Sequence, residues 1–149
     1  MERLFGLPAH PLVVHFPVVA IPLLALALFA LILRPHWLDS IGPGIAIFSV
    51  VTFVSTLLAT RSGEAFSELL ASGDTIDDHR TLGEQLRWIV GAQAVLAILM
   101  VLNNTTGFLQ REHPFYRLLT SLAAVTSVVA IVWAIRTGHT GAEQSWGFL

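Results

Sequence analysis

The sequence of 149 residues contains no cysteine, which excludes disulfides, thiolate nucleophiles, iron–sulfur clusters, c-type haem attachment and CxxC redox chemistry. It also contains no lysine, so all eight cations are arginine, and charged residues make up only 12% of the chain. A soluble domain usually carries about 25% charged residues. The net charge of −2 argues against nucleic-acid binding, which requires clustered basic side chains. The shortage of charge therefore points away from both a water-soluble protein and a nucleic-acid partner.

In place of charge the chain has four long apolar stretches, none of which contains Asp, Glu, Lys or Arg. The stretches cover residues 4–33, 40–60, 88–110 and 118–135. A hydrocarbon layer about 30 Å thick requires about 20 residues of helix to cross it, and each stretch is long enough, the last one only just. We therefore predict an all-α integral membrane four-helix bundle that forms a single domain over residues 1–149. Its spans are predicted at about 11–33, 45–60, 86–102 and 118–136.

Polar and glycine signals predict where the helices begin and end. Thr81, followed three residues later by Glu84, has the spacing of a capping box, which predicts the start of the third span at this point. Gly138 predicts the end of the fourth span and places His139 in a loop that can turn back over the bundle. Residues 64–71, between the second and third spans, have the composition of a short surface helix. These boundaries define which polar residues lie outside the apolar layer.

An even number of spans puts both termini on the same side of the membrane. The N-terminus, the polar segment 61–87 and the C-terminal tail then share what we call the long-loop side, and the two short connections share the short-loop side. The short connections carry Arg34, Arg111 and Arg117 within a small number of residues. The positive-inside rule therefore favours a cytoplasmic position for the short-loop side.

Four of the six histidines fall on the long-loop side, and a bundle would gather them at one end. They are His10, His15, His79 and His139. Neutral imidazole binds zinc, copper, iron and haem iron without carrying a charge into a medium of low dielectric constant. His15 lies inside the first apolar stretch, where an ionisable group usually faces the interior of a bundle. The convergence of these histidines predicts a cofactor-binding or metal site at the long-loop end.

Two carboxylates extend this candidate site. Glu64 follows the second span and Asp78 precedes the third, so the predicted metal ligands are these two carboxylates and the four histidines. Each histidine also has a simpler explanation. His10 can bond to free backbone groups at a helix start, and His15 can bond to a backbone carbonyl in the core. His79 and His139 can be solvated loop residues.

Four short motifs, in order along the chain, carry a family resemblance. They are His10-Pro-Leu-Val-Val-His15-Phe-Pro17, Ser62-Gly63-Glu64-Ala65, His79-x-x-Leu-Gly83-Glu84 and Gly138-His139-x-Gly141. By these motifs, which extend over nearly the whole chain, the sequence resembles the DUF2231 family of small bacterial membrane proteins. The resemblance implies four spans in a bacterial inner (cytoplasmic) membrane. Members are similar in span layout to b-type cytochrome membrane modules, which implies a redox or haem role by analogy alone.

Three functions are compatible with these residues. The first is a redox module that holds haem b, or a metal centre, and passes electrons to a membrane redox partner, with His15 and His79 as the first pair of ligands and His139 as a substitute. The second is a non-haem metal-handling protein, for which transport would require a homo-oligomer or a partner. The third is a structural or interaction subunit without a cofactor, whose polar residues only satisfy helix ends. No motif of hydrolytic catalysis such as GxSxG supports an enzyme of that class.

Overall fold

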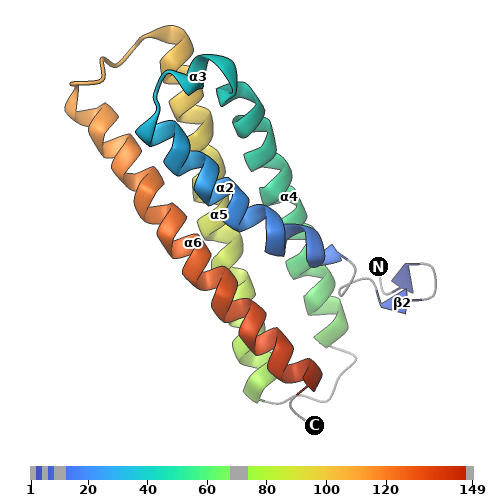
Figure 1. The fold of residues 1–149 in the computed structure, drawn as a ribbon. Coiled ribbons are helices and arrows are strands. Elements are labelled where there is room, and N and C mark those ends of the chain that lie inside the picture. Colours follow the sequence, from blue (N-terminus) through green and yellow to red (C-terminus); the bar gives the residue numbers. More distant parts are fainter. Residues whose placement is uncertain (1–2, 5–6, 9–12, 68–73, 147–149) are drawn as a thin grey trace.

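The computed structural model describes residues 3–4, 7–8, 13–67 and 74–146, and these are almost entirely helical. Four long helices follow in the order α2 (His15–Leu33), α4 (Gly42–Ser67), α5 (Asp74–Thr106) and α6 (Pro114–Trp146), with the short helix α3 (Trp37–Ser40) between the first two. Two strands of two residues each, β1 (Arg3–Leu4) and β2 (Leu7–Pro8), form an antiparallel pair ahead of α2 (Figure 1). All four long helices are long and apolar enough to cross a membrane, which confirms the predicted all-α membrane bundle.

The four long helices form a ring in which each contacts two neighbours: α2 contacts α4, α4 contacts α5, α5 contacts α6, and α6 contacts α2. Successive long helices run in opposite directions, so the start of α5 and the ends of α4 and α6 lie together at the long-loop end (Figure 1). Helix α2 begins part-way along the bundle at His15, and the other three helices continue beyond it (Figure 1). Among the described residues, the long-loop end is therefore built mainly from α4, α5 and α6.

Two features of the polar segment differ from those predicted. Helix α5 begins at Asp74, so Thr81 and Glu84 lie within it and do not form a capping box at its start. Helix α4 includes the described part of residues 64–71, which therefore forms no separate surface helix. Outside the apolar layer, ion pairs between side chains one turn apart stabilise a helix. In α5, Nε of Arg80 lies 3.4 Å from Oε1 of Glu84. The helices consequently extend further than the apolar stretches alone indicate.

Helix α6 also continues past its predicted end. It passes through Gly138 and Gly141 as far as Trp146, so His139 is helical and does not lie in a loop. Glycine in a helix is less favourable than alanine by about 1 kcal/mol. The end of α6 packs against His79 of α5, and this contact between helices outweighs the unfavourable propensity.

The core is apolar toward the short-loop end of the bundle. The larger cluster of buried residues lies there and consists of Leu24, Leu28, Leu31, Leu38, Ile45, Ala97, Met100 and Ala123. A smaller buried cluster nearer the long-loop end consists of Ile21, Leu86, Val90 and Ala130. The short-loop end is therefore closed by well-packed aliphatic side chains.

Polar side chains are buried in the same interior. They are Ser49, Thr52 and Thr56 of α4, Gln93 of α5 and Ser127 of α6. The hydroxyl groups donate to carbonyl oxygens of their own helices at 2.7 to 2.8 Å, which satisfies them in an apolar surrounding. Small residues also let α4 and α5 approach closely, because Gly91 and Gly83 of α5 face Phe53 and Thr60 of α4. The α4–α5 contact thus holds the long-loop end of the bundle together.

Candidate functional site

His79, near the start of α5, is half-buried against the end of α6. Its Nδ1 lies 3.0 Å from the carbonyl oxygen of Thr137 and 3.1 Å from Oγ1 of Thr140. A carbonyl oxygen can only accept a hydrogen bond, so Nδ1 carries the proton and donates it. In the neutral ring, Nε2 is then the unprotonated nitrogen. These contacts join α5 to α6 and set the tautomer of His79.

Gly141 lies directly against the ring of His79. A Cβ atom at position 141 would lie 3.0 Å from Cε1 and 3.4 Å from Nδ1 of that ring. Carbon atoms in favourable contact are about 3.5–4.0 Å apart, so a side chain at this position would displace the ring or the helix. A Cβ atom at Gly138, one turn earlier, would meet no neighbouring atom within 4 Å. The final glycine of the Gly138-His139-x-Gly141 motif is thus explained by the space that it leaves for His79.

The hydrogen bond of His79 has a chemical consequence. Histidines that bind metals usually donate the proton of the other ring nitrogen to a carbonyl oxygen or a carboxylate, which fixes the orientation of the ring. His79 has this arrangement with the carbonyl oxygen of Thr137. Its Nε2 can therefore bind a metal ion or haem iron, or accept a hydrogen bond.

A second polar feature joins α4 to α5. Nη1 of Arg87 lies 3.7 Å from Oε1 of Glu64, and the two side chains are 23% and 34% exposed, respectively. Nε of Arg87 is buried and has no hydrogen-bond partner within the described residues. Charged groups near an apolar layer usually pair. The position of Glu64 and Arg87 next to two apolar stretches is the signal from which this ion pair could have been predicted. Glu64, a predicted metal ligand, therefore has a cation as its neighbour.

His15, His79 and Arg87 lie at different depths in the bundle. Arg87 follows His79 by eight residues on α5, which is about 12 Å along the helix axis. Ile21 of α2 packs in the same cluster as Val90 of α5, and the two helices run in the same direction. His79 lies eleven residues before Val90, whereas His15 lies six residues before Ile21. His15 is therefore about one and a half turns nearer the middle of the bundle than His79.

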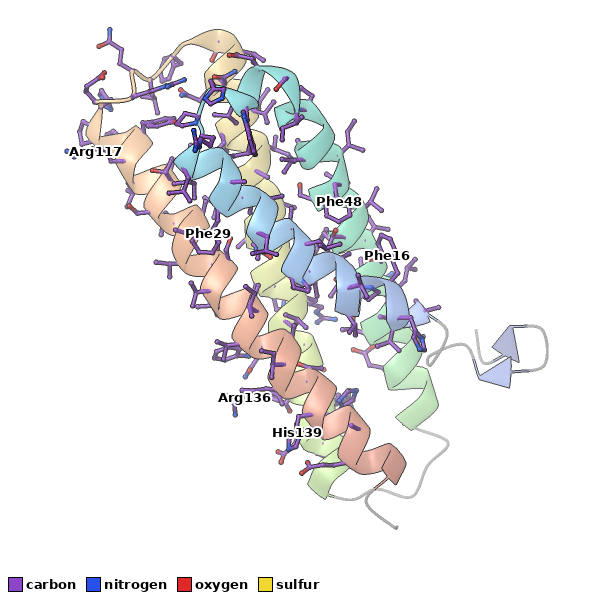
Figure 2. The ribbon with its side chains drawn as sticks, viewed as in Figure 1. Phe16, Phe29, Phe48, Arg117, Arg136 and His139 are labelled. Carbon is purple, nitrogen blue, oxygen red and sulfur yellow. The ribbon has the colours of Figure 1, made fainter. Side chains whose placement is uncertain are left out.

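His139 lies on the outside of α6. Its Nε2 is 3.2 Å from Oε1 of Glu143 one turn further along, and its side chain is 73% exposed. Figure 2 shows His139 and Arg136 on the same outer face of the helix. Successive helical residues are about 100° apart, so Thr137 and Gly141, which face α5, lie nearly opposite His139. The expectation that His139 turns back over the bundle is wrong because α6 stays helical here.

The other predicted ligands occupy separate positions. Asp78 is exposed on α5, and His15 is the exposed first residue of α2. His10 lies outside the described residues. Among the side chains that the structure describes, those of residues 13–64 and 77–143, no group of three or more His, Asp or Glu is close enough to hold a metal ion. The complete ligand set, which includes His10, stays a prediction.

Gln93 is a buried polar residue that the sequence reasoning missed. Its Nε2 donates to Oγ of Ser127 at 3.4 Å, and its Oε1 has no hydrogen-bond partner in the described part of the chain. The available signal was a glutamine five residues inside the apolar stretch 88–110, because polar residues of membrane helices usually face neighbouring helices. This amide lies deeper in the bundle than His79 and belongs to the packing of α5 against α6.

The comparisons with known proteins agree with this architecture. The sequence model of one family, described as a predicted membrane protein (DUF2231), matches residues 6–149. No curated protein and no solved structure gives a significant match. The family match includes all four motifs that carry the resemblance, and its description agrees with four helices able to cross a membrane. The protein is therefore a membrane protein with several spans, and it belongs to the DUF2231 family.

Proposed function

We propose that this protein is an electron-transfer module that binds haem b at its long-loop end, with His79 as an axial ligand. The observation that supports the proposal is the hydrogen bond from Nδ1 of His79 to the carbonyl oxygen of Thr137 at 3.0 Å. This bond orients the ring and leaves Nε2 as the nitrogen that can bind iron. When bound, haem b supplies a reversible one-electron couple.

The number of nearby ligands favours haem over a bare metal ion. A structural zinc site requires four protein ligands, and a catalytic zinc site requires three. The described residues contain no group of three His, Asp or Glu side chains that could supply them. Haem iron receives four nitrogens from its own macrocycle, so one or two histidines are sufficient. A non-haem metal site would therefore need a ligand from outside the described residues, such as His10, whereas haem needs fewer protein ligands.

The second axial ligand and the partners of the haem propionates follow from the remaining polar residues. We propose His15 or His10 as the second ligand, as in the sequence analysis; His15 begins α2 on the long-loop side of the bundle, and His10 lies outside the described residues. Arg61, exposed near the end of α4, and Arg80, near the start of α5, are the proposed cations for the propionates. The module would act in the bacterial inner membrane with a redox partner or a second copy.

A structural or interaction subunit is the second candidate, and one observation favours it. Nδ1 of His79 contacts Thr137 and Thr140 of α6 at 3.0 and 3.1 Å, so the residue also connects two helices. Such a connection stabilises the bundle without any cofactor, by about 1 kcal/mol for each hydrogen bond. In this alternative, His79→Ala lowers the stability of the protein and changes no spectrum.

The experiment is a haem titration of the full chain in detergent, followed by oxidised and dithionite-reduced spectra and a metal determination. The variants are His79→Ala and His15→Ala, and the matched control is His113→Ala, which changes an exposed histidine on the short-loop side. We expect one haem per chain with sharp reduced α-bands in the wild type and in the control. We expect loss of these bands in His79→Ala.

Two results would contradict the haem proposal. One is the absence of haem binding by folded wild-type protein after reconstitution, with helical content shown by circular dichroism. The other is an unchanged spectrum in His79→Ala. Stoichiometric metal without haem bands would instead favour the non-haem site.

A further inference from the structure

Helices α5 and α6 are longer than a membrane requires. Each has 33 residues, or about 50 Å of helix, whereas the hydrocarbon core of a bilayer is about 30 Å thick. The uncharged part of α5, residues 88–106, measures about 28 Å, and that of α6, residues 118–135, measures about 27 Å. These two parts match the hydrocarbon core, so the remaining residues lie outside it. Most of them, residues 74–87 of α5 and 136–146 of α6, are at the long-loop end of the bundle (Figure 1).

Two tryptophans mark the boundary of the hydrocarbon core at this end. Trp88 is 69% exposed where the uncharged part of α5 begins, and Trp133 lies near the end of that of α6. Nε1 of Trp133 donates to Oε1 of Gln85 at 2.8 Å, so the two tryptophans lie within about one turn of each other in depth. The guanidinium carbon of Arg87 is 5.4 Å from the ring centre of Trp88. That of Arg136 is 5.5 Å from the ring centre of Trp133. Tryptophans with polar neighbours are typical of the interface between hydrocarbon and water.

The contact between His79 and α6 lies on the water side of these tryptophans. His79 precedes Trp88 by nine residues, or about 13 Å of helix. Its partners Thr137 and Thr140 follow Trp133 by four and seven residues, or about 6 and 10 Å. A bilayer is about 40–45 Å thick with its headgroups and about 30 Å without them, so each headgroup layer is about 5–8 Å thick. The ring of His79 therefore lies at or beyond the outer edge of the headgroups.

The charged residues around His79 agree with a position in water. Asp77, Asp78 and Arg80 are exposed on the same part of α5. A charged side chain in the centre of a bilayer costs about 2.5–3.5 kcal/mol even on the lowest scales, so this part of the helix is excluded from the hydrocarbon. On α6, His139 is exposed on the outer face at the same end (Figure 2).

We infer that the His79 site projects from the membrane into water and that its redox partner is a water-soluble electron carrier, not a quinone dissolved in the bilayer. The inference rests on the proposed function, because it names the partner of a haem held by His79. A quinone ring moves within the hydrocarbon core and its interface, which lie about 10 Å below His79. The reduced carrier gives one electron to ferric haem iron, which becomes ferrous, and the carrier is oxidised by one electron.

The position of the site is tested with spin labels, because a single cysteine introduced into this cysteine-free chain is the only attachment point. The variants are Val128→Cys, Ile135→Cys and Gly138→Cys, at exposed positions of α6 that follow one another toward the long-loop end. A Cβ at Gly138 meets no neighbouring atom within 4 Å, so this position tolerates a label. In nanodiscs, we expect the ratio of oxygen collisions to collisions with a water-soluble nickel chelate to be highest at position 128. The ratio should fall at position 135 and reach the value of a label in water at position 138.

The partner is tested with the haem-loaded full chain in nanodiscs and two quinols that share one headgroup. Ubiquinol-0 has no tail and dissolves in water, whereas the tail of ubiquinol-10 confines it to the bilayer. Each quinol gives up two electrons and two protons and so reduces two haems. We expect ubiquinol-0 to produce the reduced α-band and ubiquinol-10 to produce it far more slowly. In detergent micelles, where the tail no longer confines the quinol to a bilayer, this difference should shrink.

Two outcomes would overturn the inference and leave the haem function standing. One is reduction in nanodiscs by ubiquinol-10 as fast as by ubiquinol-0. The other is a collision ratio at position 138 that equals the ratio at position 128, in variants shown to be folded by circular dichroism. Absence of haem binding would instead overturn the proposed function and its partner together. The spin labels need no haem, so they would still decide whether the His79 end lies in water.

Discussion

Replacing Gly141 by alanine is the sharpest test of the contact between His79 and α6. The added Cβ would lie 3.0 Å from Cε1 and 3.4 Å from Nδ1 of His79, so the ring must move away from its present position. Movement of the ring lengthens the hydrogen bond from Nδ1 to the carbonyl oxygen of Thr137, which is now 3.0 Å long. Gly138→Ala is the matched control, because a Cβ there meets no neighbouring atom within 4 Å.

The expected magnitude follows from two opposing effects. Alanine in a helix is more favourable than glycine by about 0.5–1 kcal/mol, and both substitutions receive this gain. At position 141 the gain is opposed by the weakened hydrogen bond of His79, whose net contribution is about 1 kcal/mol. We therefore expect Gly138→Ala to raise the free energy of unfolding and Gly141→Ala to be less stable than Gly138→Ala by about 1 kcal/mol.

The assay is denaturant unfolding in detergent micelles, followed by circular dichroism, for both variants in the wild-type and His79→Ala backgrounds. In the wild-type background the two variants should differ. In the His79→Ala background the difference should disappear, because no ring remains to be displaced. Equal free energies of unfolding in the wild-type background would refute the reasoning, as would a difference that persists without His79.

Two further predictions concern polar groups inside the bundle. Glu64→Ala leaves the half-buried Arg87 without the carboxylate at 3.7 Å and should lower the free energy of unfolding by about 1 kcal/mol, since both side chains are partly exposed. The double variant with Arg87→Ala should lose less than the sum of the two single variants, and additive losses in this double-mutant cycle would contradict an interaction. Gln93→Leu removes a buried Oε1 that has no partner among the described residues, while Oγ of Ser127 keeps its bond to the carbonyl oxygen of Ala123 at 2.7 Å. We expect unchanged or raised stability, by up to about 1 kcal/mol, in the same unfolding assay, and a loss above about 2 kcal/mol would show that the amide is satisfied in the native protein.

The fold could be predicted from the sequence because a lipid environment leaves few alternatives. Every backbone polar group within the hydrocarbon layer must be satisfied inside the protein, and apolar stretches of about 20 residues have the length of a spanning helix and not of a spanning strand. Helix ends outside that layer are set differently, by contacts that the sequence does not display. Gly138 does not end α6, because the following turn packs against His79 of the neighbouring helix.

For the candidate site, the sequence predicts only the end of the bundle at which the site lies. Four spans place Glu64, His79 and His139 at the same end, as the helix directions confirm. Whether their side chains meet depends on the rotation of each helix about its axis. Gly138 predicts a loop at His139, whereas the position of His139 on the outer face of α6 follows only when residues 114–146 form one helix. The role of Gly141 depends on its distance from the ring of His79, which the sequence does not predict either.

The most direct test of the central claim is the tautomer of His79, because the proposed iron ligand is its Nε2. The measurement is a long-range proton–nitrogen correlation spectrum of the full chain labelled with nitrogen-15 histidine, with His79→Ala used to assign the signals. The hydrogen bond to Thr137 predicts a neutral His79 ring with the proton on Nδ1 and an unprotonated Nε2, whose nitrogen-15 signal should shift when haem is added. A neutral ring with the proton on Nε2 would contradict the account.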